Sequence, residues 1–478
     1  MVFSSPIFLF AFLPITLAVV ALVKGHRFQN AWLLGMSALF YFWGAGAGIG
    51  AILFVTLVSY GAAFLPWARL KGDPDAGTSR WPARLVLAGV ILVLLIPIGI
   101  FKYAPSLFER AGSDALASLV LPLGISFFTF HAISYVVDVF RGTVEREANL
   151  RDYALYLFIF PHQIAGPIVR YSEIRHELKS VRQPRLLEVG YGASRFVWGL
   201  AKKVIIADQC GLVADQVFAA NAGGNLSMGE AWIGAFMYAM QIYFDFSGYS
   251  DMAIGLALML GFRFPENFFQ PYRSISVTDF WKRWHMTLTR WFRDYVYIPL
   301  GGNRRGAGRE YLALIVVFTL TALWHGDAIT FLVWGGIHAA ALLFERITRL
   351  RDWKGWTIAR RAAMFVFIVS SWVPFRAPDG TALRSFWTSM FAGEWRDLPP
   401  YLITDMTGVI LFAALMGIVS LFGPRANTGF GTLFGASNVG EIESFRWRRA
   451  IPMIGVTGVA AILMVLWSGY SPFLYFQF

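Results

Sequence analysis

Long apolar runs follow one another along the 478-residue chain, with short polar segments between them. Runs long enough to cross or deeply enter a bilayer lie near residues 6–23, 31–45, 48–66, 84–101, 115–137, 152–169, 191–217, 230–261, 311–323, 327–344, 359–375, 402–422 and 450–468. Allowing for re-entrant pieces, we expect about 10 to 13 membrane-embedded helices. The runs do not alternate as barrel strands do, and backbone groups in lipid must be hydrogen-bonded internally. The predicted fold class is therefore an all-α polytopic integral membrane protein.

Residues 279–298 have a different pattern, in which aromatic and basic positions separate. At about 100° per residue, one helical face collects Trp281, Trp284, His285, Leu288, Phe292, Tyr295 and Val296. The opposite face carries Lys282, Arg283, Arg290 and Arg293. This pattern predicts an amphipathic helix at the membrane interface, with His285 turned toward the protein interior and Pro299-Leu-Gly-Gly ending the helix.

Composition agrees with a membrane protein, since 57% of the residues are hydrophobic and only 15% are charged. The net charge of +12 does not indicate nucleic acid, because the Lys and Arg residues cluster in short segments between apolar runs, as in cytoplasmic loops. No soluble domain is evident, so one transmembrane domain is expected over residues 1–478. Residues 424–449 are expected to form an extramembrane loop. The N-terminal run lacks a basic region before it and is interpreted as a retained first helix.

Two histidines are the main candidates for chemistry. His285 lies among tryptophans, and His325 lies inside an apolar segment, where an ionisable residue is a functional hypothesis by default. The other histidines in or beside apolar runs, His131, His162 and His338, are interpreted as hydrogen-bonded packing residues. The single cysteine, Cys210, is interpreted as a buried apolar thiol. The chain offers no His or Cys cluster with ligand spacing, so no metal and no bound redox cofactor is expected.

The segment "YFDFSGYSDMAIG" places further polar side chains in an apolar run, namely Asp245, Ser247, Tyr249 and Asp251. Carboxylates at membrane depth must face water or a partner. The residues alone leave open a proton relay, a structural network and the lining of a reaction chamber.

Seven motifs occur in an order that resembles the membrane-bound O-acyltransferase family, and more closely its bacterial alginate O-acetylation branch. They are "MVFSSPIFLFAFLP", "LPLGISFFTFHAISYVVDVFRG", "PHQIAGPIVR", "QIYFDFSGYSDMAIGLALMLGFRFPENF", "FWKRWHMTLTRWFRDYVYIPLGGNR", "LWHG" and the final "YFQF". The resemblance covers essentially the whole chain. It implies a ring of helices around a thinned centre, with His325 as the central catalytic histidine and His285 as the second signature position.

The resemblance also implies a substrate and partners. Acetyl-CoA on the cytoplasmic side would be the acyl donor, and the acetyl group would pass outward for O-acetylation of an exported cell-envelope polysaccharide such as alginate. A periplasmic serine-hydrolase-like acetyltransferase would be the partner, and the location would be the bacterial inner membrane. The substrate-binding residues expected in the chamber are Trp324, Arg283, Trp284, Asp245, Ser247, Tyr249 and Asp251.

The chemistry assigned to these residues is direct acyl transfer. Imidazole suits the removal of a hydroxyl proton, because its unperturbed pKa of about 6.5 leaves it largely neutral at cytoplasmic pH. We assign His325 as the base, and His285 orients the acceptor, polarises the thioester carbonyl or serves as a structural support. The basic residues Lys282, Arg283, Arg290 and Arg293 either attract the phosphates of CoA or anchor lipid headgroups. No serine lies in a nucleophile elbow, so direct transfer is preferred to a covalent acyl-enzyme.

Two other functions remain open. A secondary transporter or polysaccharide exporter would also give many helices with buried charges, but it should carry paired interrupted helices in two related halves rather than a histidine pair. D-alanyl transfer to teichoic acid from a carrier-protein thioester is the alternative within the family.

Overall fold

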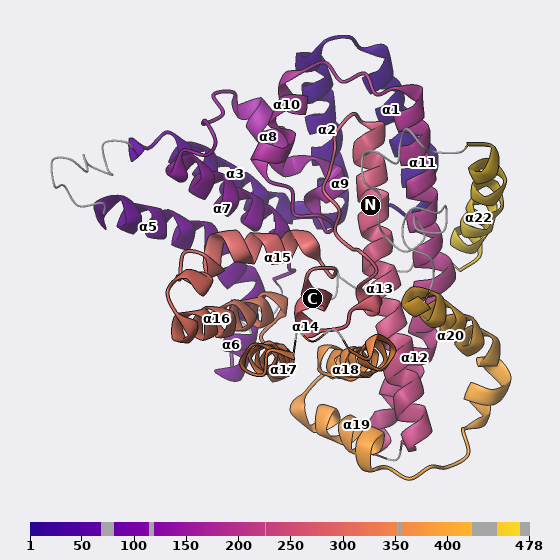
Figure 1. Ribbon diagram of the computed structural model, residues 1–478. Coiled ribbons are helices and arrows are strands. Elements are labelled where there is room, and N and C mark those ends of the chain that lie inside the picture. Colours follow the sequence, from indigo (N-terminus) through magenta and orange to yellow (C-terminus); the bar gives the residue numbers. More distant parts are fainter. Residues whose placement is uncertain are drawn as a thin grey trace. The chain divides into compact units, whose positions relative to one another are not determined.

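A computed structural model describes residues 1–67, 81–113, 119–224, 226–350, 353, 355–422 and 447–468 (Figure 1). These residues form helices joined by turns and loops, and no strand occurs among them, which confirms the all-α class. Most of the predicted loop 424–449 lies outside the described residues, and its last three positions open helix α22 (Trp447–Ser468). The motif "YFQF" also lies outside them.

The chain divides into two compact units. Met1–Ala193 with Ala253–Pro265 form unit 1, and Ser194–Met252 with the described part of Glu266–Phe478 form unit 2. The division falls inside α11 (Leu186–Ala201) and α13 (Met228–Met259), so each of these helices contributes residues to both units.

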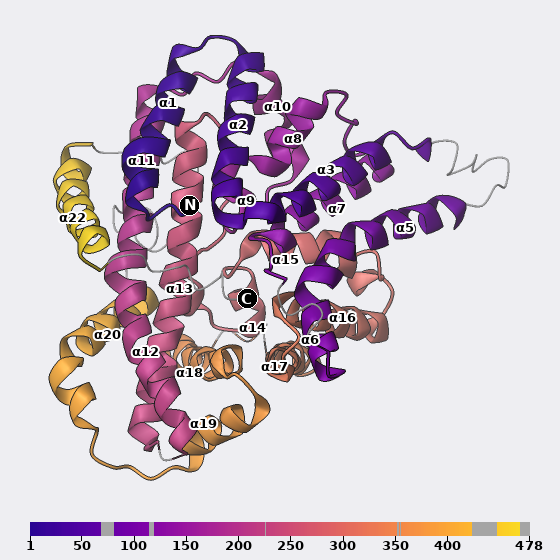
Figure 2. The same cartoon turned by 180° about the vertical axis from the view of Figure 1, so that it is seen from behind.

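Unit 1 contains the N-terminal helices. They are α1 (Leu13–Leu22), α2 (His26–Ala45), α3 (Ile49–Ala63), α5 (Trp81–Ile98), α6 (Ala104–Arg110), α7 (Ile125–Arg141), α8 (Leu150–Phe158), α9 (Phe160–Gln163) and α10 (Tyr171–Lys179). Helix α3 packs on α5 and α7, while α2 packs on α1 and α8 (Figures 1 and 2). Rings of Phe3, Phe8, Phe40 and Phe160 meet with centroids 5.1 to 6.4 Å apart and form an apolar centre between α2 and α9.

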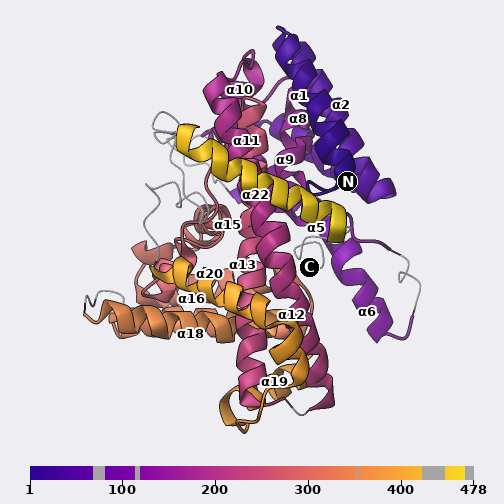
Figure 3. The same ribbon diagram turned by 90° about the vertical axis from the view of Figure 1, so that its right-hand side faces the viewer.

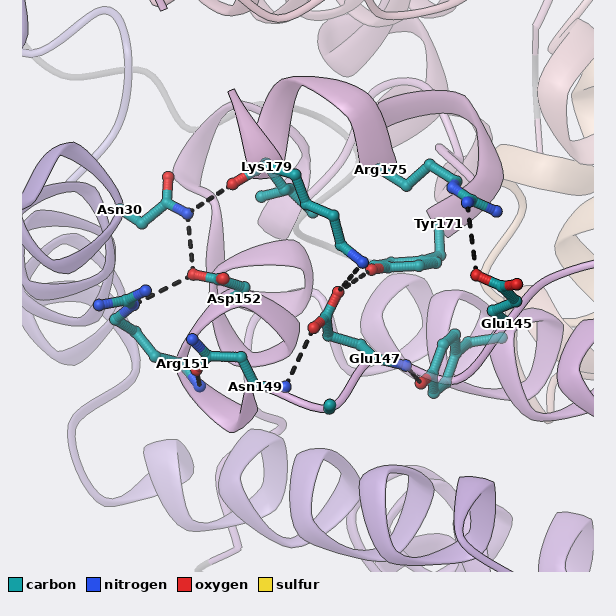
Figure 4. Close-up of polar contacts among 12 residues, drawn as sticks. Asn30, Glu145, Glu147, Asn149, Arg151, Asp152, Tyr171, Arg175 and Lys179 are labelled. Carbon is teal, nitrogen blue, oxygen red and sulfur yellow. Dashed lines mark hydrogen bonds and ion pairs between the residues drawn. The ribbon is translucent and has the colours of Figure 1, made fainter. Parts of the chain in front are cut away.

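A polar network ties the loop after α7 to α10 (Figure 4). The carboxylate of Glu147 accepts hydrogen bonds from the Tyr171 hydroxyl and from the backbone N–H of Asn149 at 3.0 Å, and lies 3.2 Å from Lys179 Nζ. Burial alone would raise the pKa of Glu147, but these three partners outweigh it and hold that pKa below its ordinary value. The buried carboxylate is thus kept charged and fixes this loop.

Two histidines of unit 1, His131 and His162, are packing residues. The rings of His131 and His162 lie 4.4 Å apart, and both are fully buried. The Val169 N–H donates to His131 Nε2 at 3.2 Å, and His162 Nε2 lies 2.8 Å from the carbonyl oxygen of Tyr156. The interpretation of these two as hydrogen-bonded packing residues is confirmed.

Unit 2 contains the π-helical segment η4 (Lys202–Ala207) and most later helices. They are α12 (Asp208–Ala220), α14 (Val277–Trp281), α15 (Met286–Phe292), α16 (Ala307–His325), α17 (Ile329–Ile347), α18 (Thr357–Arg376), α19 (Gly380–Ala392), α20 (Thr407–Phe422) and α22. Helix α17 lies between α16 and α18 and also contacts α14 (Figure 1). Helices α20 and α22 pack on α12 and η4, respectively (Figure 3). Cys210 on α12 is buried, as predicted.

Five helical stretches in the described part are long and apolar enough to cross a membrane: His26–Ala63, Pro82–Arg110, Ala307–His325, Ile329–Ile347 and Thr357–Arg376. Three shorter apolar helical stretches are Phe8–Leu22, Thr407–Val419 and Ile454–Trp467. The expected larger number of membrane-embedded helices includes α11 and α13, which carry buried charges, and that number stays a prediction.

Candidate active site

His325 is the last residue of α16 and lies among aromatic rings. Its ring centroid is 4.6 Å from that of Phe375, 5.3 Å from that of Trp334 and 6.0 Å from that of Phe331. Only 8% of His325 is exposed. A Cβ on Gly326 would lie 2.6 Å from the ring of Phe331, so glycine is required here by that ring. The aromatic cage excludes bulk water from one side of the imidazole.

His285 lies at a break in the chain, which corrects the prediction of one helix over residues 279–298. Helix α14 ends at Trp281, α15 begins at Met286, and His285 between them has φ 41°. The cause is Asn267, whose backbone oxygen accepts from the Met286 N–H at 2.9 Å and whose side-chain Oδ1 accepts from the Thr287 N–H at 3.4 Å. These two N–H groups therefore begin a new helix instead of bonding to carbonyls one turn earlier.

The predicted faces of residues 279–298 nevertheless survive the break. Of the predicted aromatic face, Trp281, Trp284, His285, Leu288 and Phe292 are buried, whereas Tyr295 and Val296 are partly exposed. Lys282 and Arg293 are exposed, and Arg283 and Arg290 are partly exposed. The prediction that His285 points inward is confirmed, since only 2% of it is exposed.

Asn267 also decides the tautomer of His285. Oδ1 is identified as oxygen because the Thr287 N–H, which can only donate, points at it, and Thr287 Oγ1 lies 2.8 Å away. His285 Nδ1 lies 2.9 Å from the same Oδ1, so Nδ1 carries the proton and Nε2 is the acceptor nitrogen. Burial lowers the pKa of His285 to about 3, which keeps the imidazole neutral at cytoplasmic pH.

The two histidines line one cavity in unit 2. Its volume is about 30 Å³, which is the space of a single water molecule. The lining residues come mainly from α13 to α18: Ile242, Asp245, Phe246, Trp281, Trp284, His285, Leu288, Thr321, His325, Trp334, Trp372 and Phe375. Residues 40 positions apart in sequence thus meet at one small, mostly aromatic chamber, which we call the histidine cavity.

A larger pocket adjoins the histidine cavity. It has a volume of about 290 Å³ and shares Trp281, Leu288 and Thr321 with the smaller cavity. Its remaining lining residues are Thr278, Lys282, Thr289, Phe292, Arg293, Tyr297, Leu314, Val317, Phe318, Leu342 and Arg346. We call it the outer pocket. Its three cationic side chains and its apolar walls suit a ligand that has an anionic part and an apolar part.

The structure places the other predicted site residues in different surroundings. Asp245 and Trp284 line the histidine cavity, and the Trp324 ring lies 4.4 Å from that of His325. Arg283 is not in the cavity lining, because its Nε bonds to Asp279 Oδ1 at 2.8 Å.

Three members of the segment "YFDFSGYSDMAIG" also lie outside that lining. Ser247 and Tyr249 are buried in α13. Asp251 is ion-paired with Arg195 at 2.9 Å and with Lys202 at 2.5 Å. Asp251 thus belongs to a buried ionic network, and its predicted contact with a substrate stays a prediction.

Sequence reasoning missed several lining residues, chiefly Trp334, Trp372, Phe375 and Thr321. Thr321 precedes His325 by one helical turn, so helical spacing alone could have suggested it. The rings on α17 and α18 carry no such signal, because aromatic residues are frequent throughout the chain. The interpretation of His338 as hydrogen-bonded is corrected: its ring packs against Trp281 and Trp334 with centroids 5.2 Å apart, but neither of its nitrogens has a hydrogen-bond partner in the described part of the chain.

No group of three or more His, Cys, Asp or Glu side chains in the described ranges is placed to hold a metal ion. The expected absence of a metal and of a bound cofactor stays a prediction.

Sequence comparison shows which known proteins this chain resembles. A sequence model of the membrane-bound O-acyltransferase family matches residues 117–373, which include both histidines. The probable alginate O-acetylase of Pseudomonas putida is 40% identical over the full length of both chains. A peptidoglycan O-acetyltransferase of Helicobacter pylori is 34% identical, with 79% of this chain and 77% of that protein covered. A teichoic acid D-alanyltransferase of Bacillus subtilis is 27% identical over 61% of this chain and 78% of that protein.

Proposed function

Because the chain belongs to the membrane-bound O-acyltransferase family and is thus a multi-pass membrane acyltransferase, we propose that it takes acetyl from cytoplasmic acetyl-CoA and passes it across the membrane for O-acetylation of an exported polysaccharide. The single observation that carries the proposal is the pair His285 and His325 on one enclosed cavity, beside a larger pocket with cationic residues.

The outer pocket is assigned to the donor. The phosphates of CoA would be attracted by Lys282, Arg293 and Arg346, and the pantetheine arm would run along the apolar wall toward Trp281 and Thr321. The pocket and the histidine cavity share those last two residues, so a thioester at their junction would reach the histidines. Attraction of lipid phosphates to the same cations is the competing explanation.

In the proposed reaction, a hydroxyl oxygen of the acceptor attacks the thioester carbonyl. His325 takes up the hydroxyl proton, the new C–O bond forms, and the C–S bond breaks as the tetrahedral intermediate collapses. The proton then passes from His325 to the departing thiolate and gives free CoA. No covalent acyl-enzyme is needed.

The tautomer of His285 distinguishes between its two expected catalytic roles. A neutral ring whose Nδ1–H is bound to Asn267 presents an acceptor nitrogen, which cannot donate to a thioester carbonyl. It can accept a hydrogen bond from a second hydroxyl of the acceptor. We therefore assign His285 to orientation of the acceptor.

Donors for the developing oxyanion are available from tryptophans of the cavity lining. The indole N–H groups of Trp281 and Trp334 are buried and have no hydrogen-bond acceptor among the described residues. Preorganised donors of this kind stabilise charge that develops in the transition state. We assign this role to Trp334, whose ring packs directly on His325.

The acceptor is proposed to be a cell-envelope polysaccharide such as alginate. Support comes from the full-length similarity to alginate O-acetylases and from the lower coverage of the D-alanyltransferase. A periplasmic serine-hydrolase-like acetyltransferase as the partner and the inner membrane as the location belong to the same proposal.

The test uses purified protein in lipid nanodiscs with acetyl-CoA carrying a labelled acetyl group. Release of free CoA, with label appearing as an alkali-labile ester on added polysaccharide, is the expected result. A parallel arm supplies a D-alanyl carrier-protein thioester in place of acetyl-CoA. Turnover of that substrate alone would replace the donor assignment, and uptake of a solute without CoA release would indicate a transporter.

A further inference from the structure

Unit 2 contains a group of buried ion pairs that join α11, η4, α12 and α13. Lys203 Nζ lies 2.8 Å from Asp245 Oδ1 and 2.6 Å from Asp208 Oδ1. One residue earlier, Lys202 Nζ lies 2.5 Å from Asp251 Oδ2. Both lysine side chains are almost completely buried, at 3% and 0% exposed. Buried lysines are costly unless paired, so the arrangement calls for an explanation.

The close approach of two glycines explains how these lysines reach α13. A Cβ on Gly199 would lie 2.5 Å from the carbonyl oxygen of Gly248, and a Cβ on Gly248 would lie 2.8 Å from that of Gly199. The backbones therefore touch just before η4 begins at Lys202. Lys202 and Lys203 are consecutive residues of the π-helical η4, so their side chains point in different directions and reach different carboxylates on α13.

The two lysines differ in what their carboxylates face. Asp245 lines the histidine cavity together with His285 and His325, whereas Asp251 does not line it. Asp251 is also held by Arg195, whose Nε lies 3.0 Å from it. Lys203 is therefore ion-paired with a residue that lines the histidine cavity. Lys202 is equally buried, but its ion-pair partner lies outside the cavity lining.

We propose that Lys203 is a positioning residue that holds Asp245 as a carboxylate on the wall of the histidine cavity, where its negative charge stabilises the imidazolium formed when His325 takes up the acceptor proton. The inference rests on the proposed function, because it presumes proton uptake by a histidine of this cavity. Lys203 carries one positive charge between two carboxylates, so a negative charge is left on the cavity side. Asp245 stays ionised throughout and exchanges no proton.

Removal of the Lys203 charge acts through Asp245. A carboxyl group buried beside aromatic rings without a nearby cation favours its neutral form, which offers no charge to an imidazolium. The titratable groups around Asp245 include Lys203 from η4, which also holds Asp208, and Tyr238 from α13, and His285 and His325 line the same cavity. The transition state for proton uptake by His325 then loses the negative charge of Asp245, while the outer pocket is unchanged.

The experiment compares Lys203→Met with Lys202→Met, a matched change of one buried, ion-paired lysine on the same turn. Both proteins are purified in nanodiscs and assayed for CoA release over a range of acetyl-CoA concentrations. Lys203→Met is expected to lower kcat about 100-fold with KM for acetyl-CoA unchanged, since general base catalysis is commonly worth about 10² to 10⁴ in rate. Lys202→Met is expected to keep kcat within about threefold of wild type, although it loses thermal stability.

Two further variants separate charge from packing. Lys203→Arg retains a cation and should recover kcat to within about tenfold of wild type. Asp245→Asn should resemble Lys203→Met, and the double variant should lose little more than either single variant because both act through one carboxylate. Equal losses of kcat in Lys202→Met and Lys203→Met at equal folded fraction, or near wild-type kcat in Lys203→Met, would overturn the proposal.

Failure of the proposed function gives a different result. If wild-type protein releases no CoA from acetyl-CoA, the donor assignment is wrong. The same variants are then ranked by ester content of cell-envelope polysaccharide in cells that depend on this protein. A loss of ester confined to the Lys203 and Asp245 variants supports the positioning role, whatever the acyl donor is. An equal loss of ester in Lys202→Met contradicts that role.

Discussion

Replacement of Asn267 by Leu tests whether the tautomer of His285 matters for catalysis. Leucine nearly matches asparagine in volume and keeps water out, but it offers no acceptor to His285 Nδ1–H or to the Thr287 N–H. The hydroxyls of Thr287 and Ser250, which lie 2.8 and 3.0 Å from the Asn267 side chain, can rotate toward other partners. Two fixed donors are therefore left unsatisfied.

The magnitude follows from the cost of such donors. Each unsatisfied buried donor costs about 1 to 3 kcal/mol, so Asn267→Leu should lower the stability of the protein by about 2 to 6 kcal/mol. In the variant, the Nδ1–H tautomer of His285 leaves its donor unsatisfied and lies about 1 to 3 kcal/mol above the Nε2–H tautomer, so only a minor fraction of the protein presents an acceptor nitrogen to the cavity. At about 1.4 kcal/mol per factor of ten, kcat should fall by about 5-fold to 150-fold.

The assay is CoA release by monodisperse protein at a temperature well below the unfolding transition. Ser250→Ala is the matched control, because it removes the partner of Asn267 Nδ2 and leaves the contact with His285 intact. It should cost some stability and little kcat. Unchanged kcat in Asn267→Leu, or an equal loss in Ser250→Ala, would refute the role of the tautomer.

Three further predictions concern single side chains. His325→Gln keeps hydrogen bonding but cannot take up a proton, so acetyl transfer should fall by about 10² or more with the fold intact, and near wild-type rates would leave His285 as the base. Trp334→Phe removes a donor proposed for the oxyanion and should lower kcat by about 10² with KM nearly unchanged; a rise in KM alone would argue against this role. The pKa of Glu147 is lowered in the folded protein. The contribution of its carboxylate to the stability of the protein is therefore complete above the unfolded pKa of about 4.3, and it is lost as the pH falls through the folded pKa. Thermal unfolding should therefore find Glu147→Gln less stable by about 1 to 3 kcal/mol at pH 7 and nearly equal to wild type at acidic pH, whereas Glu145→Gln, whose side chain is 89% exposed, should differ little at either pH.

Apolar run length was sufficient to predict most of the long helices. The runs near 31–45, 230–261 and 359–375 correspond to α2, α13 and α18 within a few residues. Helices α10 and α19 were missed because they are short and mixed in polarity, so they carry no long apolar run. The run 152–169 is broken after Phe158, since α8 ends there and Pro161 lies in the first turn of α9.

The candidate site was predicted in part, for a physical reason. Helical periodicity identifies the buried face of a segment, and it correctly turned His285 inward. Periodicity does not identify the partner on the other element. Lys203 and Asp245 are 42 positions apart in sequence. Their pairing depends on the contact between Gly199 and Gly248, which no local sequence pattern predicts.

The backbone at His285 shows most directly why the site exceeds what the sequence pattern predicts. A non-glycine residue at φ 41° is strained by about 1 kcal/mol or more, and glycine would relieve that strain at once. Glycine would also remove the ring from the histidine cavity. The conformation persists because Asn267 accepts from Met286, Thr287 and His285, so the same residue that breaks the predicted helix holds the imidazole and its tautomer. His285 is strained, is held by Asn267 and lines one cavity together with His325. A role in the chemistry of this cavity explains that combination better than a role in folding does.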